Sequence, residues 1–68
     1  MYRQDIRGSM AHAAMLGAQG IITQSEAQTL IDGLAGILED LESGKLEIDG
    51  TCEDIHMFVE QELTARIG

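Results

Sequence analysis

Apolar residues recur at intervals of three or four in three stretches of the chain. The first, at about residues 3–18, carries Ile6, Met10, Ala13 and Leu16. The second, at about residues 24–43, carries Ala27, Leu30, Leu34, Ile37 and Leu41. The third, at about residues 52–66, carries Ile55, Phe58, Val59 and Leu63, and Ile67 continues the same stripe. Because this spacing puts apolar side chains on one face of a helix, the pattern predicts an all-α chain of three helices.

The borders between these stretches carry the residues that begin and end helices. Thr23 and Glu26 form a T-x-x-E capping box, in which each side chain satisfies a backbone N–H of the first turn. Gln19-Gly20 and Ser43-Gly44 are typical of helix ends. Residues 45–50 alternate apolar and polar positions, but no partner strand is available, so we expect a loop there.

Several glycines lie inside the first two predicted helices. Gly8 weakens the first helix by roughly 1 kcal/mol relative to alanine, which suggests a close helix contact at that position. Gly33 and Gly36 in the second helix are expected to permit close packing.

The length and composition indicate one small intracellular unit. A chain of 68 residues buries only about 60% of its unfolded surface, so its core is thin. Cys52 is the single cysteine, which excludes an internal disulfide and favours a reducing cytoplasm. The polar N-terminus is unlike a signal peptide, and no apolar run is long enough to span a membrane.

The charge excludes further classes of partner. Twelve acidic residues against four basic ones give a net charge of -8, which repels nucleic-acid phosphates and anionic bilayers. One Phe and one Tyr also leave little aromatic surface for base stacking. We therefore expect neither a nucleic-acid partner nor a membrane partner.

Three polar residues of the first helix could share one face. Asp5, Ser9 and His12 place an acid, a hydroxyl and an imidazole at helical spacing. A nucleophilic triad also needs donors that stabilise an oxyanion, and the sequence offers none nearby. The interpretation that we favour is a solvated or subunit-facing polar stripe.

A second cluster resembles half of a carboxylate-bridged di-iron site. Glu53 precedes His56 by three residues, and Glu60 follows His56 by four. A complete site needs a second Glu-x-x-His motif, which the chain lacks. The acidic segment 49–54 lacks calcium-loop spacing as well. We therefore expect no metal and no cofactor, and a small metal-binding bundle stays the weakest hypothesis.

Three stretches together resemble one enzyme family. Residues 4–16, QDIRGSMAHAAML, are similar to the D-I-x-G-S-x-A-H-A-x-M-L segment of bacterial argininosuccinate lyases. Glycines at Gly33 and Gly44 fall where that family has them, and residues 53–68 resemble its E-D-I-H-x-x-x-E-x-x-L-x-x-x-I-G run. The order and spacing of these segments cover the whole chain.

The resemblance implies a function that the chain alone does not complete. The family cleaves argininosuccinate to arginine and fumarate by β-elimination, and its members are mainly helical homotetramers with composite active sites. The family's serine loop, histidine-bearing loop and G-R-S-R-N-D segment have no counterpart here. The resemblance thus implies that residues 1–68 form one helical segment of a larger N-terminal enzyme domain, with no catalytic residues.

Only the E-D-I-H turn approaches the family's site. The resemblance makes Asp54 and His56 substrate-proximal residues that orient a neighbouring substrate loop. We expect the isolated chain to be inactive and to self-associate through apolar helix faces, on the side of Leu30, Leu34, Ile37 and Leu41. The alternative is a free-standing acidic helical module that binds a partner protein, and the ending at Ile67-Gly68 favours the lyase segment over it.

Overall fold

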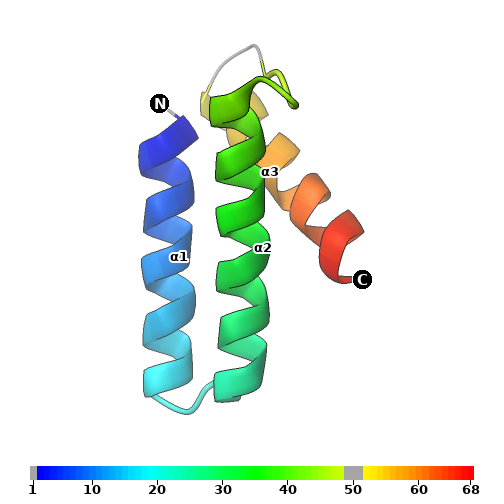
Figure 1. The fold of residues 1–68 in the computed structure, drawn as a ribbon. Coiled ribbons are helices and arrows are strands. Elements are labelled where there is room, and N and C mark those ends of the chain that lie inside the picture. The colour runs from blue at the N-terminus through cyan, green and yellow to red at the C-terminus, as the bar shows by residue number, and fades with distance from the viewer. Residues whose placement is uncertain (1, 49–51) are drawn as a thin grey trace.

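The computed structural model describes residues 2–48 and 52–68, which contain three helices (Figure 1). These are α1 (Tyr2–Ala18), α2 (Gln24–Ser43) and α3 (Cys52–Ile67). No strand is present in the described ranges, and this confirms the predicted all-α class. Helix α1 begins one residue earlier than predicted and α3 ends one residue later. Residues 45–48 contain no strand, whereas 49 and 50 of the predicted loop lie outside the described residues.

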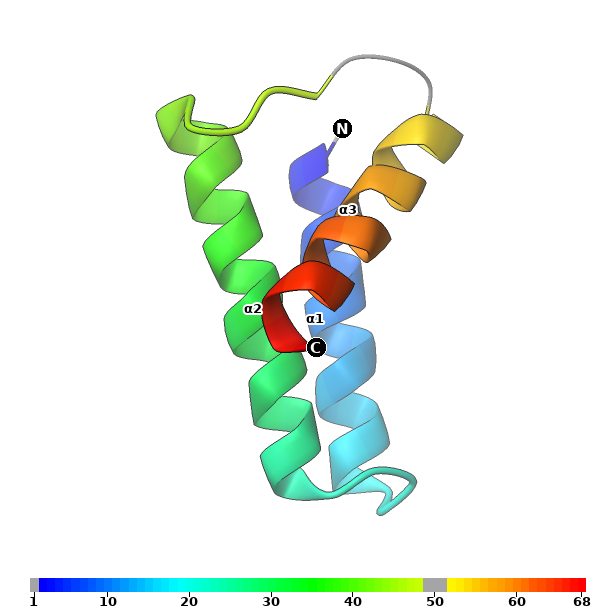
Figure 2. The same cartoon turned by 90° about the vertical axis from the view of Figure 1, so that its right-hand side faces the viewer.

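Helices α1 and α2 form an antiparallel hairpin, and α3 crosses one side of it obliquely (Figures 1 and 2). Helix α3 begins at the end of the hairpin that holds the start of α1 and the end of α2. Its second half packs against α2, where Leu63 and Arg66 approach Gly33 and Gly36, and α3 stops well short of the turn that joins α1 and α2. The part of the hairpin nearest that turn therefore extends beyond the end of α3.

The start and end of α2 have the predicted caps. The Glu26 N–H donates to Thr23 Oγ1 at 3.0 Å, and the Thr23 N–H donates to Glu26 Oε1 at 2.9 Å, which confirms the capping box. At the other end, Gly44 has φ 84°, and its N–H donates to the Leu41 carbonyl. Glycine takes this left-handed conformation without a Cβ clash, so the helix ends there.

The core lies where all three helices meet. Its buried members are Ile6 from α1, Leu34, Ile37 and Leu41 from α2, and Ile55 and Val59 from α3. Ile6 and Ile37 are 0% exposed. These residues occupy the predicted stripes, so the apolar pattern located the core correctly.

The prediction that this side of α2 joins two copies of the chain is wrong. Leu34, Ile37 and Leu41 are buried within the chain, because α1 and α3 cover the face that carries them. Leu30 is the one member of that set that remains half-buried. The large apolar side chains that stay exposed lie elsewhere and are Met15, Ile21, Met57 and Ile67.

The glycine expectations are partly correct. A Cβ at Gly33 would lie 2.6 Å from Leu63 Cδ1, and one at Gly36 would lie 3.0 Å from Arg66 Nη1, so both allow α3 to approach α2 closely. The expectation for Gly8 was wrong, since nothing lies within 4 Å of its Cβ position. The close approach of α1 to α2 occurs instead at Gly17, where a Cβ would lie 2.7 Å from Ala27 Cβ.

We predict opposite effects for alanine at two glycines of α1. Gly17→Ala is expected to lower the free energy of unfolding by about 1–3 kcal/mol, because the Ala27 methyl group is fixed to its backbone and the helices must separate. Gly8→Ala is expected to raise it by about 0.5–1 kcal/mol through helix propensity alone. Urea unfolding followed by circular dichroism measures both, and equal signs for the two variants would contradict the packing at Gly17.

Arginine side chains form ion pairs that connect α2 to each of the other two helices. Arg66 Nη2 lies 2.6 Å from Asp40 Oδ2 of α2 and 3.3 Å from Glu62 Oε1 of its own helix. The hydrogen bond to Asp40 is the main reason that the pKa of Arg66 is raised. Arg3 of α1 pairs with Glu42 of α2 at 2.5 Å. Both pairs are partly exposed, so each contributes little stability.

Within the described residues, none of the helices has the combination of length and hydropathy that crossing a membrane requires.

Candidate functional site

The two residues that the resemblance singles out lie at the start of α3. Ile55 and Val59 are buried against the other helices and set the rotation of α3 about its axis. Asp54 is exposed at the third residue of the helix, where a carboxylate suits the positive end of the helix dipole. His56 follows Ile55 and is turned toward α1, with 53% of its side chain exposed.

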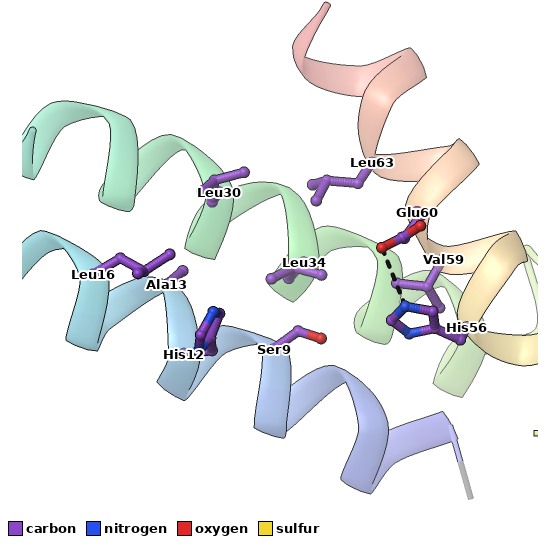
Figure 3. Close-up of a pocket in the computed structure, with 10 residues that line it drawn as sticks. All are labelled: Ser9, His12, Ala13, Leu16, Leu30, Leu34, His56, Val59, Glu60 and Leu63. Carbon is purple, nitrogen blue, oxygen red and sulfur yellow. Dashed lines mark ion pairs between the residues drawn. The ribbon is translucent and has the colours of Figure 1, made fainter. Parts of the chain in front are cut away.

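The imidazole of His56 lies between two carboxylates. Its Nε2 is 3.1 Å from Glu60 Oε1, one turn further along α3 (Figure 3). Its Nδ1 is 3.7 Å from Asp5 Oδ2 of α1. The second distance exceeds a hydrogen bond, so that contact is electrostatic and needs the protonated ring. The arrangement restrains the ring from both sides while leaving one edge open to solvent.

Asp5 is held unusually for a surface acid. Its Oδ2 atom is shielded from solvent and has no hydrogen-bond partner among the residues that the structure describes. A shielded carboxylate oxygen without a donor is costly, and the group that approaches this oxygen is the imidazole of His56, with Nδ1 at 3.7 Å. This contact joins α1 to the first turns of α3.

A groove of about 160 Å³ opens beside His56 and Glu60 (Figure 3). Helix α2 forms its apolar floor, and α1 and α3 form its walls. The lining residues are Ser9, His12, Ala13, Leu16, Leu30, Leu34, His56, Val59, Glu60 and Leu63. Polar groups from α1 and α3 thus face each other across apolar side chains.

The three polar residues of α1, Asp5, Ser9 and His12, lie on one side of the molecule but do not form a catalytic arrangement. Asp5 contacts His56, while Ser9 and His12 line the groove. In residues 2–48 and 52–68, no hydrogen bond links the Ser9 hydroxyl to the His12 imidazole. His12 is therefore not positioned to activate this hydroxyl as a base.

Metal ligation finds no support in this part of the molecule. Among the described residues, no group of three His, Cys, Asp or Glu side chains is placed to hold a metal ion. The Glu60 carboxylate faces Nε2 of His56. The Glu53 side chain and residues 49–51, which belong to the motifs considered above, lie outside the described part.

The contact between Asp5 and His56 was missed in the sequence. The pairing of His56 with Glu60 follows from their separation of four residues on one helix, and could have been predicted. No local pattern joins Asp5 to His56, because their meeting depends on how α3 crosses α1. The placement of Ser9, His12 and Glu60 around one groove has the same origin.

The chain is similar to several curated proteins that are named argininosuccinate lyase. The chain is 61% identical over 67 residues to an argininosuccinate lyase from Lachnospira eligens, which covers 98% of this chain. It is 59% identical to that of Heliobacterium mobile and 60% identical to that of Desulforamulus reducens, each over all 68 residues. The chain spans about 15% of the length of each of these relatives.

No family model matches the chain, and no solved structure matches it either. The matches to the curated relatives nevertheless span the whole sequence. Over its whole length the chain is therefore similar in sequence to part of the argininosuccinate lyases, and this similarity supports an N-terminal segment of such an enzyme.

Proposed function

We propose that this chain serves as the N-terminal part of a cytoplasmic argininosuccinate lyase. The parent enzyme would cleave argininosuccinate to arginine and fumarate in arginine biosynthesis. The observation that carries the proposal is the identity of about 60% to enzymes of that name across the whole chain. We place residues 1–68 as one helical segment of a larger enzyme domain.

The reaction assigns this segment a supporting role. In a β-elimination, a base removes a proton from Cβ, charge develops on the adjacent carboxylate, and an acid assists departure of the guanidinium nitrogen. Asp54 and His56 would stand next to the substrate and orient the loop that binds it. Glu60 and Asp5 restrain the imidazole of His56 from two sides, at 3.1 and 3.7 Å, which supports a fixed position for that ring. Other segments would supply the catalytic acid and base.

A chimeric enzyme tests the proposal directly. Residues 1–68 replace the matching segment of the Lachnospira eligens lyase, and fumarate formation from argininosuccinate is followed by ultraviolet absorbance. We expect kcat/KM within about tenfold of the unmodified host, because most segment residues are identical. The isolated 68-residue chain is expected to form no fumarate.

Two controls define the result. The first is the host with its own segment deleted, which should be inactive if the segment is needed. The second is the host carrying its own segment recloned by the same junctions. An inactive chimera that is folded and assembled, or turnover by the exhaustively purified isolated chain, would overturn the proposed role.

We propose that the parent enzyme is a homotetramer and that the isolated chain self-associates. Ile21 is 64% exposed and Met57 is 57% exposed, and part of the hairpin extends beyond the end of α3. Covering apolar surface stabilises association by about 25 cal/mol per Å², and the charge of -8 opposes it until salt screens it. Sedimentation equilibrium should therefore show a mass that rises with salt and concentration. A monomer at high micromolar concentration in physiological salt would contradict this expectation.

A further inference from the structure

A second groove lies between the first turns of α2 and the last turn of α3. Its volume is about 280 Å³, and we name it the Leu30 groove. The residues that line it are Ile22, Ser25, Glu26, Thr29, Leu30 and Ile67. Ile67 is 40% exposed, and Ile22 and Leu30 are half-buried, so the groove presents apolar side chains to its surroundings.

The shape of the Leu30 groove suits a helix. Its α2 and turn residues recur at intervals of three and four, so they form a ridge along the axis of α2. Ile67, at the last turn of α3, closes the groove on one side. A helix lying along such a ridge can insert its own side chains between those of α2 and α3. In the described ranges no strand edge is present to which an extended segment could add.

The charge around the groove indicates the chemistry of that helix. Glu26 is the one charged residue among those that line it, and the chain carries a net charge of -8. A twofold contact between two copies would bring acidic surfaces together in low dielectric. A helix with lysine or arginine beside an apolar stripe would complement both the groove and its rim.

We infer that the Leu30 groove receives an apolar helix flanked by basic residues, from the remainder of the same parent polypeptide. This inference rests on the proposed function. Its further support is that the relatives are far longer than this chain, which spans about 15% of them, so most of the parent polypeptide is available to cover the groove. In the isolated 68-residue chain, where this helix is missing, the apolar side chains of the groove stay open to solvent.

Alkylation of an introduced thiol tests the inference in the full-length chimera. Thr29→Cys places a thiol at the rim of the groove, in a background with Cys52→Ser and without host cysteines. Its labelling rate in buffer is compared with its rate in urea, and the same ratio is measured for Ala35→Cys on another face of α2. We expect at least tenfold protection at residue 29, and protection that persists when the subunits are dissociated.

A charge variant tests the basic flank. Glu26→Gln removes the carboxylate, while an amide at this position keeps the capping box. Labelling at residue 29 should become about threefold faster at low salt, and the difference should vanish at high salt. Glu39→Gln, at an exposed position of α2 that does not line the groove, is the matched control and should change nothing.

The outcomes separate this inference from the proposed function. An active chimera in which residue 29 is labelled within twofold of its urea rate overturns the docked helix alone. Protection that disappears on subunit dissociation assigns the helix to a neighbouring subunit and overturns its intramolecular source. Equal salt dependence for Glu26→Gln and Glu39→Gln overturns the basic flank. A chimera that is inactive and unassembled overturns the docked helix together with the proposed function.

Discussion

Asp54→Asn in the chimeric lyase is expected to lower kcat/KM by about 100-fold. The substitution keeps the size of the side chain and removes a charge beside the proposed substrate loop. A misplacement of the substrate by about 1 Å can lower the rate by about 10²-fold, even when the altered residue lies away from the reacting atoms. Asp54 is exposed in the first turn of α3, so its loss as a helix-end charge costs only about 0.3–1 kcal/mol of stability. Steady-state fumarate formation measures the effect.

Asp32→Asn is the matched control for this experiment. Asp32 is an exposed acid of α2 that accepts a hydrogen bond from Gln28, on a surface away from His56. Its replacement should leave kcat/KM within about twofold, in line with the small effects of surface changes. If both variants keep full activity at equal thermal stability, Asp54 acts only at the helix terminus and the proposed role is wrong.

Ile37→Ala is expected to lower the free energy of unfolding by about 2–5 kcal/mol. Ile37 is 0% exposed and belongs to the core where the three helices meet. Truncation removes buried apolar atoms and leaves a cavity that rigid helices fill only partly. Because small domains have little stability to spare, this loss should leave much of the isolated chain unfolded.

Ile21→Ala provides the same chemical change at a site that is 64% exposed. It should alter the free energy of unfolding by no more than about 0.5 kcal/mol. Urea titration of both variants, followed by circular dichroism, gives the comparison. Equal midpoints for the two variants would show that Ile37 is not held in a packed core.

The helices themselves could be predicted because their signals are local. The stripe on α2 and the pair Thr23 and Glu26 lie within a few turns of one another, and the structure has both. The core residues Ile6, Ile37 and Val59 also lie on predicted stripes. A periodic apolar face must be buried against something, so its members can be named before the partner is known.

The choice of partner for each face could not be predicted in this way. We expected the Leu34 side of α2 to join two copies, and α1 and α3 cover it within the chain instead. We expected a close contact at Gly8, and the structure has it at Gly17 against Ala27. In both cases the sequence indicated that a helix face carries apolar or small side chains. The angle at which the helices cross decided which other helix packs on that face.

The sequence by itself determined the three helices, the caps of α2, the apolar stripes and the similarity of the chain to argininosuccinate lyases. Those properties depend on residues that are close in the sequence or on sequence identity to known proteins. The tertiary structure alone decided that Asp5 lies near His56 and that Leu30 is only half-buried. It also placed Ser9 and His12 across a groove from Glu60. These contacts depend on the oblique angle at which α3 crosses α2. Close packing at Gly33 and Gly36 and the ion pair between Arg66 and Asp40 allow that angle, and the sequence of one helix alone does not determine it.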